Sequence, residues 1–182
     1  MGTPRLVEIG SGRPPLSLAG REAALLVLTG ALGDAACRLG PGDAVVGPPA
    51  DLIPLAKGGT ARLLVEERPE GGGAERRRIG RGDLAGAGLP GITGVRLLHR
   101  TAGGSLLRLG PPPGARWLVT GLRAVAVFTG RLLLYEEAVP REIPAGGWLV
   151  ATDPSRTLPL QAGNDSALAL GLAAPDVRVV LG

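Results

Sequence analysis

The sequence predicts an all-β protein built from two similar halves. The chain has 182 residues, and its 31 glycines and 17 prolines interrupt it too often for long helices. Most apolar runs are only four or five residues long and are bounded by Gly, Pro or Asp, a pattern typical of short strands. The chain also matches itself at a separation of 100 residues, which indicates an internal repeat.

The repeat is clearest around one tetrapeptide. Residues 27–30 read Val-Leu-Thr-Gly, and residues 127–130 read Val-Phe-Thr-Gly. Upstream, Leu6 aligns with Leu106 at the same separation, and downstream the separation grows to 104 and then 105, as short loop insertions would cause. The two halves therefore look like copies of one unit. The alternative is a chance similarity between two segments rich in Gly, Leu and Ala.

A segment with little hydrophobic periodicity separates the two copies. Residues 68–91 combine glycines, prolines and an arginine cluster, which is typical of a linker or a long surface loop. We therefore predict an N-terminal domain over residues 1–70, a linker over 71–91 and a C-terminal domain over 92–182. Units of this size bury only a modest core, so we expect them to pack against each other or against a second chain.

The expected strands are short in both halves. Those of the first half cover residues 6–9, 24–28, 44–46 and 61–65. Those of the second half cover residues 105–109, 117–119, 125–128, 132–135, 148–151 and 177–181. Only residues 21–28 and 166–174 are candidates for helices, and both are short. Many brief strands separated by regular turns indicate a sandwich or a barrel.

The charge pattern argues against nucleic acid as a partner. The chain carries 20 Lys and Arg against 16 Asp and Glu, a formal net charge of +4. Apart from Arg76, Arg77, Arg78 and Arg81 the basic residues are scattered, and few aromatic residues are available to stack on bases. We therefore do not expect nucleic-acid binding.

The chain has the features of a cytoplasmic protein. Its single cysteine, Cys37, allows no internal disulfide and fits a reducing compartment. Residues 1–12 lack the basic start and apolar run of a signal peptide, and no apolar stretch approaches the roughly 20 residues that span a bilayer. We expect a cytoplasmic location and no membrane partner.

Each half contains the same series of glycine and proline markers. An apolar strand ending in Gly (residues 25–30, LLVLTG, and 125–130, VAVFTG) is followed by a short strand and a turn of the form PGD or AGG (residues 41–43 and 145–147). The final glycines, Gly30 and Gly130, are expected where a hairpin needs a positive φ. This order resembles the cupin family, and two tandem copies resemble a bicupin. The resemblance implies an all-β fold of two tandem small jelly-roll barrels.

The chain departs from the cupin pattern at the metal ligands. Typical cupins hold a divalent metal with His and Glu side chains. The family spacing places those positions at Ser17, Ala19, Ala23 and Ile53 in the first copy, and at Trp117, Val119, Arg123 and Thr157 or Leu158 in the second. None of these residues offers an imidazole or a carboxylate, and the only histidine, His99, lies outside both motifs. We therefore expect no metal, no other cofactor and no catalytic residues.

The second copy holds a cluster that suits an organic anion. An aromatic wall and guanidinium groups can bind an anion by stacking and bidentate hydrogen bonds. The candidate ligand-binding residues are Trp117, Arg123, Trp148, Asp153 and Arg156. The alternative is that both tryptophans fill the core and the arginines extend into water, because strand alternation alone does not tell which side chains face inward.

We interpret the chain as a non-catalytic, metal-free bicupin-like protein that captures a small organic anion or a protein partner and forms a homodimer. One alternative is a metal-independent isomerase or cyclase, for which His99, Asp153 and Glu142 are the candidate acid or base groups. Another alternative is a regulatory partner of a transcription factor.

Overall fold

The computed structural model describes residues 2–10, 16–33, 38–49, 55–56, 59–69, 75–80, 87–89, 91–136 and 139–182. These residues form 17 β-strands and no α-helix, so the all-β prediction is confirmed. The two helix candidates lie instead in strands β2 (Glu22–Thr29) and β17 (Leu168–Leu181). None of the described residues belongs to a helix that could cross a lipid bilayer.

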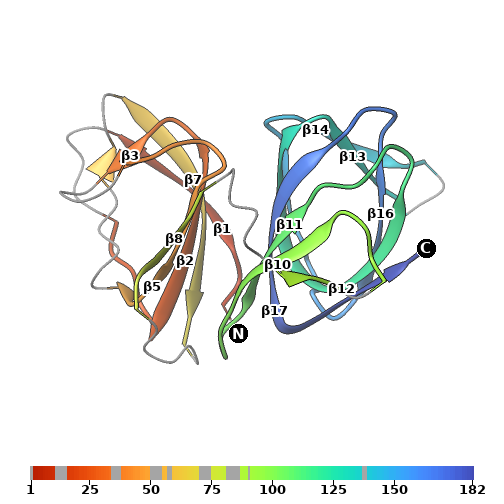
Figure 1. Cartoon of the computed structure of the whole chain (residues 1–182). Helices are drawn as coiled ribbons and strands as arrows, with labels where there is room; N and C mark the ends of the chain where they lie inside the picture. The colour runs from red at the N-terminus through yellow and green to blue at the C-terminus, as the bar shows by residue number, and fades with distance from the viewer. Residues whose placement is uncertain are drawn as a thin grey trace. The chain divides into compact units, whose positions relative to one another are not determined.

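The chain folds as two compact units (Figure 1). Unit 1 comprises Met1–Asp83 with Thr101–Gly103, and unit 2 comprises Leu84–Arg100 with Gly104–Gly182. Two strands occur where we expected a linker: β8 (Arg77–Ile79) and β9 (Ala87–Gly88). The hydrophobic pattern did not predict β8, because it is a short edge strand that tolerates exposed arginines. Charged residues on an edge strand also hinder its pairing with other chains.

Unit 1 is built from two antiparallel sheets. The larger sheet has the order β1 (Arg5–Gly10), β7 (Thr60–Arg68), β2, β5 (Ala44–Gly47) and β8. The smaller has the order β4 (Arg38–Leu39), β3 (Leu32–Gly33) and β6 (Leu55–Ala56). Alternate residues of β2, such as Leu25 and Val27, pack with Leu63 and Val65 of β7 and with Leu32 and Leu39 of the smaller sheet. The alternation therefore builds one apolar core inside the unit.

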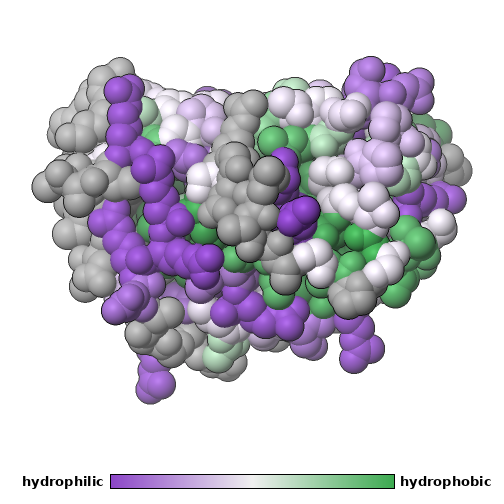
Figure 2. All heavy atoms as spheres, viewed as in Figure 1, coloured by the Kyte–Doolittle hydropathy of each residue, from purple (hydrophilic) through white to green (hydrophobic). Residues whose placement is uncertain are grey.

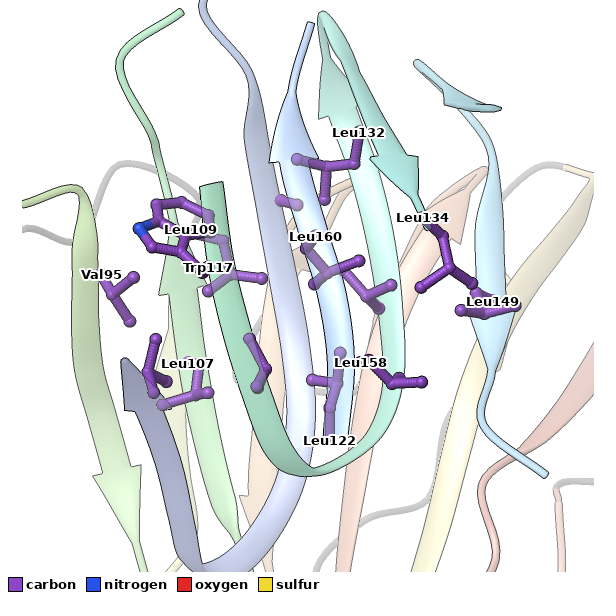
Figure 3. Packing of buried hydrophobic residues seen from close by; sticks show 14 of the residues in the cluster. Val95, Leu107, Leu109, Trp117, Leu122, Leu132, Leu134, Leu149, Leu158 and Leu160 are labelled. Carbon is purple, nitrogen blue, oxygen red and sulfur yellow. The ribbon is translucent and has the colours of Figure 1, made fainter. Parts of the chain in front are cut away.

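Unit 2 is a larger antiparallel barrel whose strands follow one continuous path. The path runs through β14 (Arg141–Pro144), β13 (Arg131–Leu134), β16 (Thr157–Ala162), β12 (Arg116–Thr129), β17, β11 (Ser105–Leu109), β10 (Val95–Arg100) and β9. Strand β15 (Trp148–Val150) lies off this path and pairs only with β12. Figure 3 shows the inward side chains of these strands, including Trp117, Leu134 and Leu160, pointing toward one another in the barrel core.

The same backbone hydrogen bonds occur within each unit at equivalent positions. In unit 1 the Val27 N–H donates to the Asp43 carbonyl oxygen at 2.9 Å, and the Gly42 N–H donates to the Val27 carbonyl oxygen at 2.9 Å. In unit 2 the Val127 N–H donates to the Gly147 carbonyl oxygen at 2.9 Å, and the Gly146 N–H donates to the Val127 carbonyl oxygen at 2.8 Å. Residue pairing follows the same offsets, because Leu25 faces Val45 and Val125 faces Leu149. The repeat in the sequence is thus a repeat of backbone structure.

The alignment of the first strands needs a correction of two residues. In unit 1, Leu64 of β7 pairs with Leu6 on one side and with Leu26 on the other. In unit 2, Leu170 of β17 pairs with Ala126, the counterpart of Leu26, so Leu170 is the counterpart of Leu64. Leu170 pairs with Arg108, so Leu6 corresponds to Arg108 rather than to Leu106. An even shift keeps the same residues pointing inward, which is why the hydrophobic pattern did not reveal it.

A buried charged network closes one end of the unit 1 sheet. Arg68 Nη1 donates to Glu22 Oε1 at 2.6 Å, and Arg68 Nε donates to Glu66 Oε2 at 2.8 Å. The Thr101 hydroxyl donates to Glu22 Oε1 at 2.7 Å. The three charged side chains are at most 1% exposed. The guanidinium bonds to both carboxylates, while Glu22 Oε2 and Arg68 Nη2 have no hydrogen-bond partner among the described residues. Breaking a buried ion pair by removing one partner is costly, so the arginine is expected to matter for stability.

Polar and apolar residues are distributed unevenly over the surface. In the view of Figure 2, hydrophilic side chains gather over unit 1, whereas hydrophobic residues reach the surface over unit 2. The exposed large hydrophobic residues of unit 2 are Val139, Trp148, Val180 and Leu181. Exposed apolar residues of this kind are a common feature of binding surfaces, so unit 2 is the better candidate for a binding site.

We expect Gly130→Ala to destabilise the protein more than Gly146→Ala. Both glycines have a positive φ, 65° and 80°, but only at Gly130 would a Cβ collide with the backbone, at the carbonyl oxygen of Ser166. Gly146→Ala should cost only the backbone strain, about 1 kcal/mol, and Gly130→Ala at least about 1 kcal/mol more. Urea unfolding monitored by circular dichroism measures both. Equal losses would contradict the predicted close approach.

We expect Arg68→Met to lower the free energy of unfolding by about 3–5 kcal/mol, because it removes the guanidinium that pairs with the buried carboxylates of Glu22 and Glu66. The matched control is Arg5→Met. Arg5 pairs with Glu67 at 2.7 Å, but its side chain is 49% exposed, so the loss should be about 0–1 kcal/mol. Chemical denaturation compares the two variants, and similar losses would refute the role given to the buried network.

Candidate ligand-binding site

A small pocket opens on the barrel of unit 2 beside strand β15. Its volume is about 80 Å³. The residues that line it are Glu136, Arg141, Leu149, Val150, Ala151, Thr152, Asp153, Arg156 and Leu158. Leu149 and Leu158 also belong to the barrel core, so the pocket has an apolar floor and charged walls.

The barrel topology explains why a pocket forms here. Strand β14 ends the continuous path of strands, and β15 pairs with β12 alone, so no described strand pairs with the second edge of β15. The pocket lies along that edge, with Leu149 and Val150 of β15 and Arg141 of β14 among its lining. A seam between two strands that do not pair leaves space for a ligand.

The backbone of β15 offers hydrogen-bonding groups on this edge. The Val127 N–H donates to the Gly147 carbonyl oxygen, and the Ala151 N–H donates to the Arg123 carbonyl oxygen. In an antiparallel ladder every second residue bonds to the same neighbour, so Leu149 also bonds toward β12. The N–H and C=O groups of Trp148 and Val150 therefore point the other way, away from β12.

The charges in the pocket are only partly neutralised. Arg156 Nη1 lies 3.6 Å from Glu136 Oε1, and both side chains are partly exposed. No side chain among the described residues makes a hydrogen bond or an ion pair with the Arg141 guanidinium. Among the residues that the structure describes, Arg141 is thus the pocket cation without a side-chain partner, and a guanidinium binds carboxylates bidentately.

Asp153 is held as a carboxylate by its own turn. Its Oδ1 accepts hydrogen bonds from the Ser155 hydroxyl at 2.6 Å and from the Ser155 N–H at 2.9 Å. The Ser155 hydroxyl, followed by the Ser155 N–H and the nearby Arg156 charge, holds the pKa of Asp153 below its usual value. Asp153 therefore contributes a fixed negative charge to the rim of the pocket.

The structure brings together two of the five residues that the sequence predicted as ligand-binding. Asp153 and Arg156 line the pocket. Trp117 is fully buried in the barrel core (Figure 3), and its Nε1 has no hydrogen-bond partner in the described part of the chain. Arg123 is 3% exposed and does not line the pocket. Trp148 is 38% exposed on β15, on the opposite face from Leu149.

Sequence reasoning missed the residues that complete the pocket, above all Arg141. Arg141 and Glu136 flank the connection between β13 and β14, and Thr152 follows β15. No motif links them to Asp153, and only closure of the barrel brings them together. The other acid or base candidates, His99 on β10 and Glu142 on β14, do not line the pocket, and Glu142 lies 3.5 Å from Arg131 instead.

Comparison with solved structures identifies the architecture. The cupin 2 conserved barrel domain protein from Leptotrichia buccalis is 10% identical, and the match covers 100% of this chain and 80% of that chain with a TM-score of 0.58. The chain has the cupin fold. A protein provisionally described as glyoxylate-induced, from Pseudomonas aeruginosa, is 16% identical, with 98% and 74% covered and a TM-score of 0.60. A protein of unknown function from Pseudomonas syringae is 13% identical, with 93% and 81% covered and a TM-score of 0.57.

These matches establish the cupin fold and nothing about activity, because the sequence identities are low. No protein-family model matches the chain, and no curated protein matches it. The matches extend over both units, which agrees with the tandem jelly-roll architecture predicted from the sequence.

At the positions where the cupin resemblance implies metal ligands, the described side chains do not fit a metal ion. In unit 2, Trp117, Val119 and Leu158 are core residues, and none of them has a metal-binding atom of the kind that divalent ions require. In unit 1, Ala23 is also a core residue, while Ile53 lies outside the described residues. Within the described part of the chain, no three His, Cys, Asp or Glu side chains gather as a metal site.

We expect the Asp153 carboxyl to stay ionised to a lower pH than an ordinary aspartate. Because its pKa is lowered in the folded state, its stabilising contribution is present above the pKa of the unfolded chain and is lost as the pH falls through the folded pKa. Carbon-13 NMR titration of the carboxyl group measures the midpoint. Ser155→Ala should raise this midpoint, and an unchanged midpoint would rule out the Ser155 hydroxyl as the main cause.

Proposed function

We propose that this chain is a non-catalytic binding protein of the cupin fold whose unit 2 captures a small carboxylate in the pocket beside β15. The observation that carries the proposal is the Arg141 guanidinium, which lines the pocket and has no side-chain partner among the described residues. A cation next to an apolar floor matches an anion with a short hydrocarbon part. The chemistry of the walls supports a carboxylate in particular.

Two kinds of donor support binding of a carboxylate here. Arg141 can form a bidentate pair with both carboxylate oxygens. The N–H of Val150, directed away from β12 by the alternation of the ladder, is a second donor at the lining. The acidic residues Glu136 and Asp153 limit this attraction, because they repel an anion with more than one carboxylate. A monocarboxylate is therefore the ligand class that the pocket suits best.

The pocket also supports binding rather than acid or base catalysis. A general acid or base works best when its pKa lies near the operating pH. The lowered pKa of Asp153 moves that carboxyl away from neutrality. The single histidine, His99, does not line the pocket. These features favour ligand capture over the metal-independent isomerase or cyclase considered from the sequence.

The proposal is tested by titrating the protein with propionate and observing the backbone amides of residues 149–153 by NMR. A ligand with so few atoms should bind with a Kd in the millimolar range, about −4 kcal/mol. Arg141→Gln should weaken binding roughly 10- to 100-fold, the effect of losing a hydrogen-bonded charge. Added salt should weaken binding to the native chain as well.

Two matched controls make this titration decisive. Propionamide has the shape of propionate without its charge and should not bind measurably. Arg178→Gln removes an exposed arginine that does not line the pocket, and it should leave the affinity unchanged. Equal affinity of Arg141→Gln and the native chain for propionate would overturn the proposal.

A further inference from the structure

The internal repeat provides a template for what can bind along β15. In unit 1, β5 is the counterpart of β15, since Ala44, Val45 and Val46 occupy the places of Trp148, Leu149 and Val150. The free edge of β5 is covered by β8, which pairs with it antiparallel. In unit 2, no described strand covers the same edge of β15. One copy of the repeat therefore shows a strand paired at an edge to which no described strand of the other copy pairs.

The backbone groups on the two edges are equivalent. The hydrogen bond from the Val27 N–H to the Asp43 carbonyl oxygen sets the alternation of β5, so the N–H and C=O groups of Ala44 and Val46 point toward β8. By the same alternation, those of Trp148 and Val150 point toward the open edge. Unpaired edge groups of this kind are a template for an added strand.

We propose that β15 accepts an extended peptide segment of a partner protein, antiparallel and in the register that β8 takes on β5. The inference rests on the proposed function, since it supplies the carboxylate as a side chain of that segment. In unit 1, Arg77 faces Val46, Arg78 faces Val45 and Ile79 faces Ala44. Transferred to unit 2, three consecutive peptide residues would face Val150, Leu149 and Trp148 in that order.

The middle residue of the peptide would be acidic. A residue opposite Leu149 has its side chain on the same face of the sheet as Leu149, which lines the pocket. That side chain would therefore enter the pocket and meet the Arg141 guanidinium, which has no side-chain partner among the described residues. In unit 1 the same position holds Arg78, whose partner is Asp43 at 3.2 Å, whereas the counterpart of Asp43 in unit 2 is Gly147. The charge preference of the position is thus reversed between the two units.

The third residue of the peptide would be aliphatic or β-branched. In unit 1 its place is taken by Ile79, which is fully buried. In unit 2 it would lie opposite Trp148, a residue that is 38% exposed and whose indole is apolar. An aromatic side chain opposite a β-branched residue is a favourable cross-strand pair. The partner segment is therefore an acidic residue followed by Ile or Val in an extended stretch.

The experiment uses the capped peptide acetyl-Thr-Thr-Glu-Val-Thr-amide and the full-length chain, with affinity measured by NMR titration. We expect the peptide to bind at least 10-fold more tightly than propionate, because strand pairing adds to the carboxylate contact. N-methylation of the second Thr, which would face Val150, removes a paired N–H and should weaken binding at least 10-fold. N-methylation of Glu is the matched control and should change binding less than 2-fold, because that N–H would point away from β15.

The outcomes separate this inference from the proposed function. If propionate binds through Arg141 but the peptide binds no more tightly, or both N-methylated peptides bind alike, strand pairing is wrong and carboxylate capture stands. A second outcome is that the peptide shows the expected N-methylation pattern, but neither replacing its Glu by Gln nor Arg141→Gln in the protein changes the affinity. In that case carboxylate capture and the acidic position are both wrong. Slow hydrogen exchange of the Val150 amide in the free protein would show an edge already covered and would also overturn the inference.

Discussion

Every strand edge presents N–H and C=O groups that must find partners, and this requirement organises the structure. Most strands meet it by pairing on both sides, as β12 does with β16 and β17. Unit 1 closes the edge of β5 with β8, even though β8 consists largely of arginine. In unit 2 no strand of the described ranges pairs with the same edge of β15, and the pocket lies along it. The candidate site is thus a consequence of incomplete strand pairing in one of two copies.

The two copies have the same backbone hydrogen bonds at one turn and differ in the side chains around it. Equivalent hydrogen bonds at Val27 and Val127 hold the same turn in both units. In unit 2 the barrel core is filled by apolar side chains, with Trp117 at a position where the cupin resemblance places a metal ligand. The charged side chains of the candidate site lie instead at the seam in the barrel wall, where Arg141 belongs to the strand that ends the path.

Sequence patterns gave the strands, the repeat and the turn glycines, because each depends on local spacing. Gly30 and Gly130 have φ values of 76° and 65°, as their positions in the repeat predicted. The pocket did not follow from the sequence, since Arg141 and Asp153 meet only through barrel closure. The burial of Trp117 was equally hidden: β12 contains register shifts near Thr120 and Leu122, and each shift breaks the simple alternation that would assign inward and outward faces.

Hydrogen–deuterium exchange of two equivalent amides tests the central claim most directly. The open-edge account predicts that the Val150 amide of the free protein exchanges rapidly, whereas the Val46 amide, directed toward β8, exchanges slowly. The Leu149 amide, directed toward β12, should be protected like that of Val46 and serves as the internal reference. Protection of Val150 equal to that of Val46 would mean that the edge of β15 is covered, and would contradict the account.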